Sequence, residues 1–195
     1  METDSPGFRH GRTLEKIGRK SQDTVELFFD SVLVPASNVI GRENGGFDHL
    51  VRLLERERLG AAIRAFCAAE WSCRWTIDYV RERQVFGRPI ADFQNTQFEL
   101  AELWSQIVVL RSFLDDCLER LMARKLSPED AAIAKLRASE LEGVVTDRCL
   151  QFFGGWGYMW EMPIARAYAD ARVSRISAGS NHILKMIIGR KLLRG

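Results

Sequence analysis

Charged side chains that could take part in acid–base chemistry are concentrated in the segment Glu55-Arg56-Glu57-Arg58. A carboxylate serves as a general base when burial raises its pKa toward the operating pH. Positions two apart on a helix are rotated by roughly 200°, so Glu55 and Glu57 cannot both face one pocket. The same pattern is also typical of a solvated helix face, on which Arg58 would pair with Glu55 for a few tenths of a kcal/mol.

Two later segments could bring the backbone close to a phosphate-bearing ligand. The glycines of Gly154-Gly155-Trp156-Gly157 have no Cβ and permit close approach. Ser180-Asn181 opens the last predicted helix, whose free N–H groups and dipole favour a phosphate. Both segments also have a structural interpretation, because glycines end helices and Ser or Asn caps them. The residues alone leave these alternatives open.

These candidates lie in a chain of 195 residues whose sequence changes from strand-like to helix-like near residue 41. Residues 24–35 are rich in β-branched and aromatic residues and end at Pro35, which predicts a strand. Two or three strands fit within residues 1–41, too few for a self-standing sheet. We therefore predict a small strand region over 1–41 and a helical domain over 42–195.

The helical domain is predicted from apolar residues that recur at steps of three and four. The pattern predicts two long helices over residues 47–83 and 93–124, with a break at Gly87-Arg88-Pro89. Ser127 is a predicted N-cap, with Pro128 in the first helical position. Further helices are expected over 127–153, after Pro163 and over 180–193. Two such long helices, stacked antiparallel, indicate a mainly α protein built as a helical bundle.

Composition excludes several functions. Hydrophobic residues make up 46% and charged residues 28%, as in a globular protein. The net charge of +2 does not favour a nucleic-acid partner, and no apolar run is long enough to span a membrane. The four cysteines form no CxxC pair, which predicts reduced thiols of an intracellular protein without a metal site. Asp115-Asp116 is expected to be a solvated pair.

Four segments, at residues 23–35, 83–94, 151–159 and 178–181, together resemble the C-terminal portion of flavin-dependent acyl-CoA dehydrogenases, most closely the long-chain type. The resemblance spans nearly the whole chain in the family's order. It implies that residues 1–41 correspond to the end of the family's middle β domain and 42–195 to its C-terminal four-helix bundle. It also implies a truncated chain, since the first residues match a segment within that β domain.

The resemblance implies FAD-dependent α,β-dehydrogenation of a long-chain or branched acyl-CoA thioester. A base removes the Cα proton while the β-hydrogen leaves as hydride to flavin N5. Many members place the base, a glutamate, where this chain has Ala178. A minority place it thirty residues before the glycine matching Gly87, which is Glu57. We therefore expect Glu57 to be the base and the Ala178 backbone N–H to bind the thioester oxygen, together with a flavin ribitol hydroxyl.

The resemblance also assigns binding roles. Arg58 matches an arginine near the CoA phosphates, and Gly179 is assigned to the substrate side. Arg83, whose planar charged fork suits a pyrophosphate, would contact the flavin of a neighbouring subunit. The residues expected to bind FAD are Arg83, Phe86, Gln94, Gln151, Gly154, Gly155, Ser180 and Asn181. For Arg83 the alternative is a cation at a helix C-terminus, and for Phe86 it is plain core packing.

The implied partners are an acyl-CoA, electron transfer flavoprotein as acceptor, and further copies of the chain in a homodimer or homotetramer. The implied location is the cytoplasm, or the mitochondrial matrix in a eukaryote. One alternative is a non-catalytic remnant or assembly subunit that needs a complementary chain to bind flavin. Another is an acyl-CoA oxidase or nitroalkane-type flavoenzyme, which differs in its electron acceptor.

Overall fold

The computed structural model describes residues 1–194 and divides into two compact units, residues 1–53 and the chain from Leu54 onward. In the first unit, β1 (Phe8–Thr13) pairs antiparallel with β2 (Val25–Phe29). Phe8 lies opposite Phe29, with ring centroids 5.3 Å apart. The strand predicted over 24–35 is therefore shorter than expected. It ends before Ser31, which has a left-handed φ of 49° that a regular strand does not accommodate.

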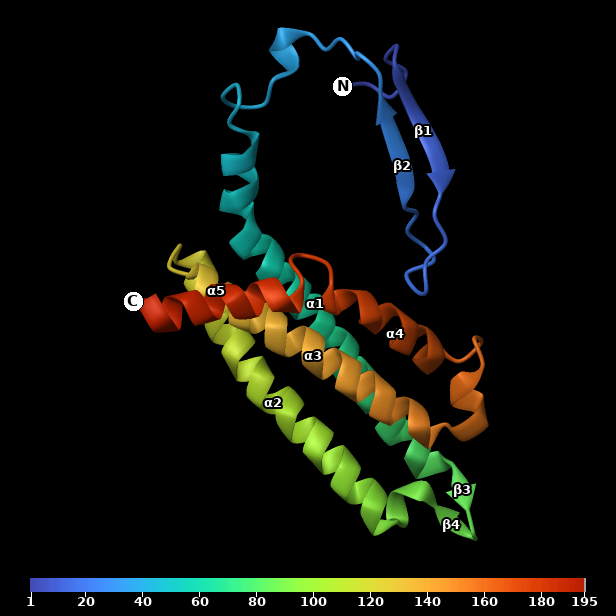
Figure 1. Cartoon of the computed structure of the whole chain (residues 1–195). Helices are drawn as coiled ribbons and strands as arrows, with labels where there is room; N and C mark the ends of the chain where they lie inside the picture. The colour runs from blue at the N-terminus through green and yellow to red at the C-terminus, as the bar shows by residue number, and fades with distance from the viewer. Residues whose placement is uncertain (195) are drawn as a thin grey trace. The chain divides into compact units, whose positions relative to one another are not determined.

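The helical prediction is confirmed for residues 1–194, with five α-helices (Figure 1). They are α1 (Gly46–Glu82), α2 (Gln94–Met122), α3 (Pro128–Phe152), α4 (Pro163–Ala171) and α5 (Asn181–Arg194). The first residues of α1, up to Leu53, belong to the first unit. Helices α2, α4 and α5 all pack against α3, which makes α3 the central element of the helical unit.

Local signals explain where these helices begin. The Ser127 hydroxyl accepts a hydrogen bond from the Asp130 N–H at 3.0 Å, and Pro128 occupies the first turn of α3. This is the predicted N-cap, which satisfies one of the free N–H groups at the helix start. Pro163 likewise opens α4, where its missing N–H costs nothing.

Two connections differ from expectation. The break after α1 is a small hairpin, in which β3 (Gln84–Val85) pairs with β4 (Arg88–Pro89). Phe86 and Gly87 form its turn with φ values of 49° and 79°, as the tightest hairpin turns require. The glycine-rich segment after α3 is a 3-10 helix, η3 (Gly154–Tyr158), where an irregular break was expected.

The core of the helical unit is built from small and branched residues of α1, α2 and α3. Leu103 and Ile107 of α2 are fully buried. They meet a series of buried alanines that lets the helices approach closely: Ala62, Ala65 and Ala69 from α1, with Ala131, Ala134 and Ala138 from α3. Three aromatic side chains, Trp75, Tyr79 and Phe153, pack together where α1 and α3 end. The ring centroid of Phe153 lies 4.6 Å from that of Trp75 and 4.2 Å from that of Tyr79.

Candidate functional site

The residues predicted to do chemistry fall into two groups near opposite ends of α1. Glu57 and Arg83 are 26 residues apart along the chain, which corresponds to about 39 Å at the rise of an α-helix. Arg83 follows directly after the last residue of α1. The two groups therefore cannot surround the same ring system of one bound flavin within a single chain.

We call the group beyond the end of α1 the hairpin-end group. It consists of Arg83, Phe86, Gln94, Gln151, Gly154 and Gly155. Stacking of Tyr79 on Phe153 brings the end of α1 beside the end of α3, and hence Arg83 toward the two glycines. Every member of the group is exposed to solvent.

The hairpin-end group leaves its backbone open to a ligand. A Cβ placed on Gly154 or Gly155 would meet no atom within 4 Å, and Gly154 has a φ of 57°. These residues thus provide accessible backbone at the same end of the helical unit as the permanently charged Arg83 guanidinium, a combination that fits a pyrophosphate-containing group. Phe86 is 96% exposed at the hairpin tip, so the alternative that it packs in the core is wrong.

The second group is the turn between the 3-10 helix η4 (Arg172–Arg175) and α5, which we call the 176–180 turn. Ala178 and Gly179 have φ values of 54° and 90°, both in the left-handed region. Ala178 is half-buried, and within residues 1–194 its N–H has no backbone acceptor. A half-buried N–H that has no backbone acceptor is available to a ligand that accepts a hydrogen bond.

Lys135, which the sequence analysis did not single out, joins α3 to this turn. It is 1% exposed, and its Nζ donates to the Gly179 carbonyl at 2.8 Å and to Asn181 Oδ1 at 3.1 Å. The Ser139 hydroxyl donates to the same Asn181 oxygen at 3.2 Å. Burial, and then the positive charge of Arg58, lower the pKa of Lys135 to about 8. The available signal was a lysine within the alanine-rich stretch 131–138, where a buried cation needs partners.

Arg58 and Glu57 lie on different faces of α1. Arg58 is 7% exposed, and its Nε has no hydrogen-bond partner within residues 1–194, whereas Glu57 is exposed. Among the ion pairs of the same residues, none joins Arg58 to Glu55. The solvated-face interpretation is therefore wrong for Arg58. A buried donor without a partner fits a residue that receives an anionic or carbonyl ligand.

No cysteine is among the predicted site residues. All four cysteines are free thiols, and of these four Cys67 is the exposed one. Burial, and then the nearby carboxylates Asp130 and Asp116, raise the pKa of Cys117 to about 11. A thiol of this kind is unreactive near neutral pH.

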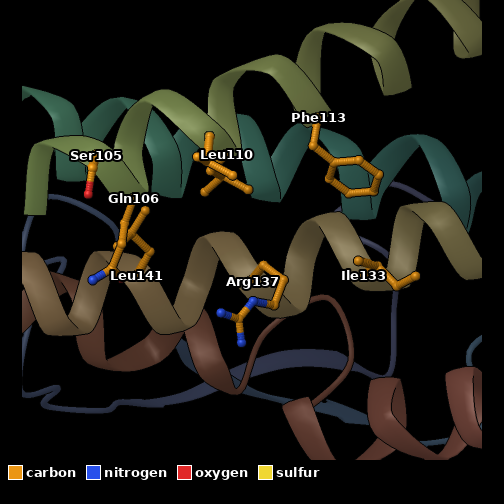
Figure 2. A pocket seen from close by; sticks show the side chains of 8 residues that line it. Ser105, Gln106, Leu110, Phe113, Ile133, Arg137 and Leu141 are labelled. Carbon is orange, nitrogen blue, oxygen red and sulfur yellow. The ribbon is translucent and has the colours of Figure 1, made fainter. Parts of the chain in front are cut away.

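A separate pocket of about 520 Å³ lies between α2 and α3 (Figure 2). Its walls are mostly apolar, and its lining includes none of the predicted site residues and no carboxylate. The lining consists of Ser105, Gln106, Val109, Leu110, Phe113, Ile133, Arg137 and Leu141. This pocket therefore offers no acid–base chemistry.

Residues 1–194 contain no helix with the length and apolar character needed to cross a membrane. They also contain no group of three or more His, Cys, Asp or Glu side chains placed to bind a metal ion.

Comparison with known proteins identifies the family to which this helical fold belongs. Residues 44–193 match the family model "Acyl-CoA dehydrogenase, C-terminal domain", so the chain belongs to the acyl-CoA dehydrogenase family. The long-chain specific acyl-CoA dehydrogenase of rat mitochondria is 46% identical over 193 residues, which cover 99% of this chain and 45% of that protein.

Solved structures agree with this assignment. An acyl-CoA dehydrogenase from Geobacillus kaustophilus superposes with a TM-score of 0.96 at 44% identity, covering 99% of this chain and 51% of that one. A chain in a structure described as the electron transferring flavoprotein of Acidaminococcus fermentans superposes with a TM-score of 0.94 at 34% identity. The match covers 100% of the present chain and 51% of that one. The present chain thus spans about half the length of the proteins that it matches.

Proposed function

We propose that the protein containing this chain removes the α-proton and the β-hydride from an acyl-CoA thioester, with FAD as the hydride acceptor. The observation that supports this most directly is the Ala178 N–H, which lies half-buried in a left-handed turn without a backbone acceptor in residues 1–194. Such a donor is suited to a thioester oxygen on which negative charge develops. Because it belongs to the backbone, it is preserved although residue 178 carries no carboxylate.

Glu57 is the proposed base. It lies next to Arg58 on α1, and the charge of Arg58 acts on Lys135, which in turn binds the Gly179 carbonyl. The charge of Arg58 thus acts on Lys135 from the part of α1 that carries Glu57, and Lys135 in turn contacts the 176–180 turn. Glu57 is exposed in the chain, so the acyl chain and flavin must exclude water from it when they bind. Arg58, with its unpartnered buried Nε, is the proposed contact for the CoA moiety.

When bound, FAD supplies the acceptor for the β-hydride. Ser180 and the start of α5 would bind it on the side of the 176–180 turn, while the hairpin-end group would bind a pyrophosphate and adenosine portion. The separation of about 39 Å between Glu57 and Arg83 supports contact of the hairpin-end group with the flavin of a neighbouring subunit. This proposal therefore includes a homodimer or homotetramer.

The remaining parts of the proposal come from the relatives. A long-chain or branched acyl group is proposed because the rat relative is named long-chain specific. Electron transfer flavoprotein is proposed as the acceptor, which separates this function from an oxidase. The proposed location is the cytoplasm, or the mitochondrial matrix in a eukaryote, as in the name of the rat protein.

The test is to add FAD to the purified 195-residue chain, remove unbound flavin by gel filtration and record the absorbance between 350 and 500 nm. Retained flavin bands that bleach under anaerobic conditions when palmitoyl-CoA is added would support the proposal. Bleaching that is reversed by electron transfer flavoprotein, and not by oxygen, would support a dehydrogenase over an oxidase.

A colourless protein would contradict catalysis by this chain alone. It would support the alternative, a non-catalytic helical unit that binds flavin only together with a complementary chain. The same measurement repeated with the chain joined to the segment that precedes it in its relatives would then show whether the site requires both parts.

A further inference from the structure

A buried lysine with two acceptors is the most unusual polar feature of the helical unit. The Lys135 side chain crosses from α3 to the 176–180 turn and binds a backbone carbonyl and a side-chain oxygen on either side of Ser180. The two contacts bridge 44 and 46 residues of sequence. Burying an ammonium is costly, so its retention in the core needs a compensating role.

The turn needs such a contact because its own backbone does little to fix it. Ala178 has a φ of 54°, which costs a non-glycine residue roughly 1–2 kcal/mol. Its neighbours Ile176 and Ser177 bond back to Val173, and Leu184 bonds to Ser180, but Ala178 and Gly179 lie between these bonded stretches. The Lys135 contact with the Gly179 carbonyl therefore falls at the point where the backbone has no hydrogen bond of its own.

Helix α3 constrains the turn from the other side as well. The Arg175 guanidinium packs over Gly143, where a Cβ would come within 2.1 Å of its Nη2, and it donates to the Glu140 carbonyl at 3.4 Å. Arg175 precedes the turn and Gly179 lies within it, so α3 contacts the chain on both sides of Ala178. The peptide plane of Ala178 is thereby constrained by contacts of a single rigid helix.

We propose that Lys135 is a positioning residue for the proposed reaction: through the Gly179 carbonyl and Asn181 it fixes the orientation in which the Ala178 N–H meets the thioester oxygen. This inference rests on the proposed function for its catalytic meaning, but the positioning of the turn can be measured without it. Lys135 itself acts through the turn and does not contact the reacting atoms.

The first experiment needs neither flavin nor substrate. Amide hydrogen exchange is measured over residues 173–184 in the wild type, in Lys135→Met and in the control Lys185→Met, which removes a half-exposed lysine of α5 from its ion pair with Glu140. We expect exchange at Ser177 and Leu184 to rise roughly tenfold or more in Lys135→Met and to remain unchanged in Lys185→Met. Unchanged exchange in a folded Lys135→Met would overturn the proposal.

The second experiment uses flavin-loaded protein and follows exchange of the acyl-CoA α-proton in D₂O. We expect Lys135→Met to lower its rate constant roughly 100-fold or more, the effect of losing one oxyanion donor, while the Kd of acyl-CoA changes less than about threefold. The infrared carbonyl band of the bound thioester should also shift back toward its frequency in water. A purely structural lysine would not move that band, so an unchanged band in Lys135→Met contradicts the positioning role.

These readouts separate the two proposals. If the wild type with bound flavin exchanges no α-proton, the proposed function fails, and amide exchange alone decides whether Lys135 fixes the turn. If Lys135→Met does not fold, as judged by circular dichroism, Lys135→Gln replaces it, since an amide of similar length keeps one donor. Lys135→Gln should then give smaller changes in the same direction, and wild-type values in both experiments would reject the proposal.

Discussion

Lys135 of α3 is buried close enough to Arg58 of α1 for the positive charge of Arg58 to lower its pKa. The two side chains are 1% and 7% exposed, so the core of the helical unit contains two cations of like charge. Repulsion between them destabilises the fold unless hydrogen bonds or ligands compensate. Lys135 has two acceptors, whereas Arg58 Nε has none within residues 1–194.

The pKa of Lys135 predicts a pH-dependent stability. Burial and Arg58 lower it from 10.5 to about 8 in the folded chain. Between these values the unfolded chain binds more protons, so the free energy of unfolding rises with pH by up to about 1.4 kcal/mol per unit. The contribution is complete above 10.5 and is lost as the pH falls through 8. Urea unfolding at pH 7.5, 8.5 and 9.5 should show the free energy of unfolding of the wild type rising relative to that of Lys135→Met. A constant difference between the two proteins would mean that Lys135 has the same pKa in the folded and the unfolded chain.

Removal of the Ser127 N-cap of α3 should lower the stability of the fold. In Ser127→Ala, the Asp130 N–H loses the hydroxyl that accepts its hydrogen bond at 3.0 Å. We expect a decrease of about 1 kcal/mol in the free energy of unfolding, measured by urea titration. Ser105→Ala is the control, because the Ser105 hydroxyl bonds only to the Glu102 carbonyl of its own helix on an exposed face. The control should remain within about 0.5 kcal/mol of the wild type.

Glu55 and Glu57 point in different directions from α1, so replacing one or the other should affect activity unequally. In the flavin-loaded protein, Glu57→Gln removes the proposed base and should slow bleaching of the flavin by acyl-CoA about 10²–10⁴-fold. Glu55→Gln makes the same chemical change at a half-buried position on another face of the helix and should have little effect. Stopped-flow absorbance at 450 nm measures both. A larger loss in Glu55→Gln would assign the base to Glu55.

Helices and their caps were predictable because they depend on residues close in sequence. The apolar steps of α1 and α2 and the Ser127-Pro128 start of α3 carry their own local signal. The hairpin at Phe86-Gly87 was not predicted, because two-residue strands leave no alternating pattern to detect.

In the candidate site, too, some features were predictable from the sequence and others depend on how distant segments pack. Glu57, Arg58 and the 176–180 turn came from the family resemblance, and their roles remain predictions. Burial of Arg58 and the Lys135 contact with Gly179 could not be inferred from sequence. They arise from packing of α5 against α3 and from the core that α1 shares with α3, and the Lys135 contact joins residues 44 positions apart.

Gly179 and Gly189 predict opposite effects for the same substitution. Gly179 has a φ of 90°, a conformation that an alanine adopts only with strain, even though its Cβ would meet nothing closer than Leu184 at 3.7 Å. Gly179→Ala should therefore lower the free energy of unfolding by about 1 kcal/mol or more. Gly189 lies inside α5 with open space around it, so Gly189→Ala should raise the free energy of unfolding by about 0.5–1 kcal/mol. Urea titration of both variants checks the signs. If Gly179→Ala proved neutral, the turn would relax readily, and a fixed Ala178 N–H would be excluded.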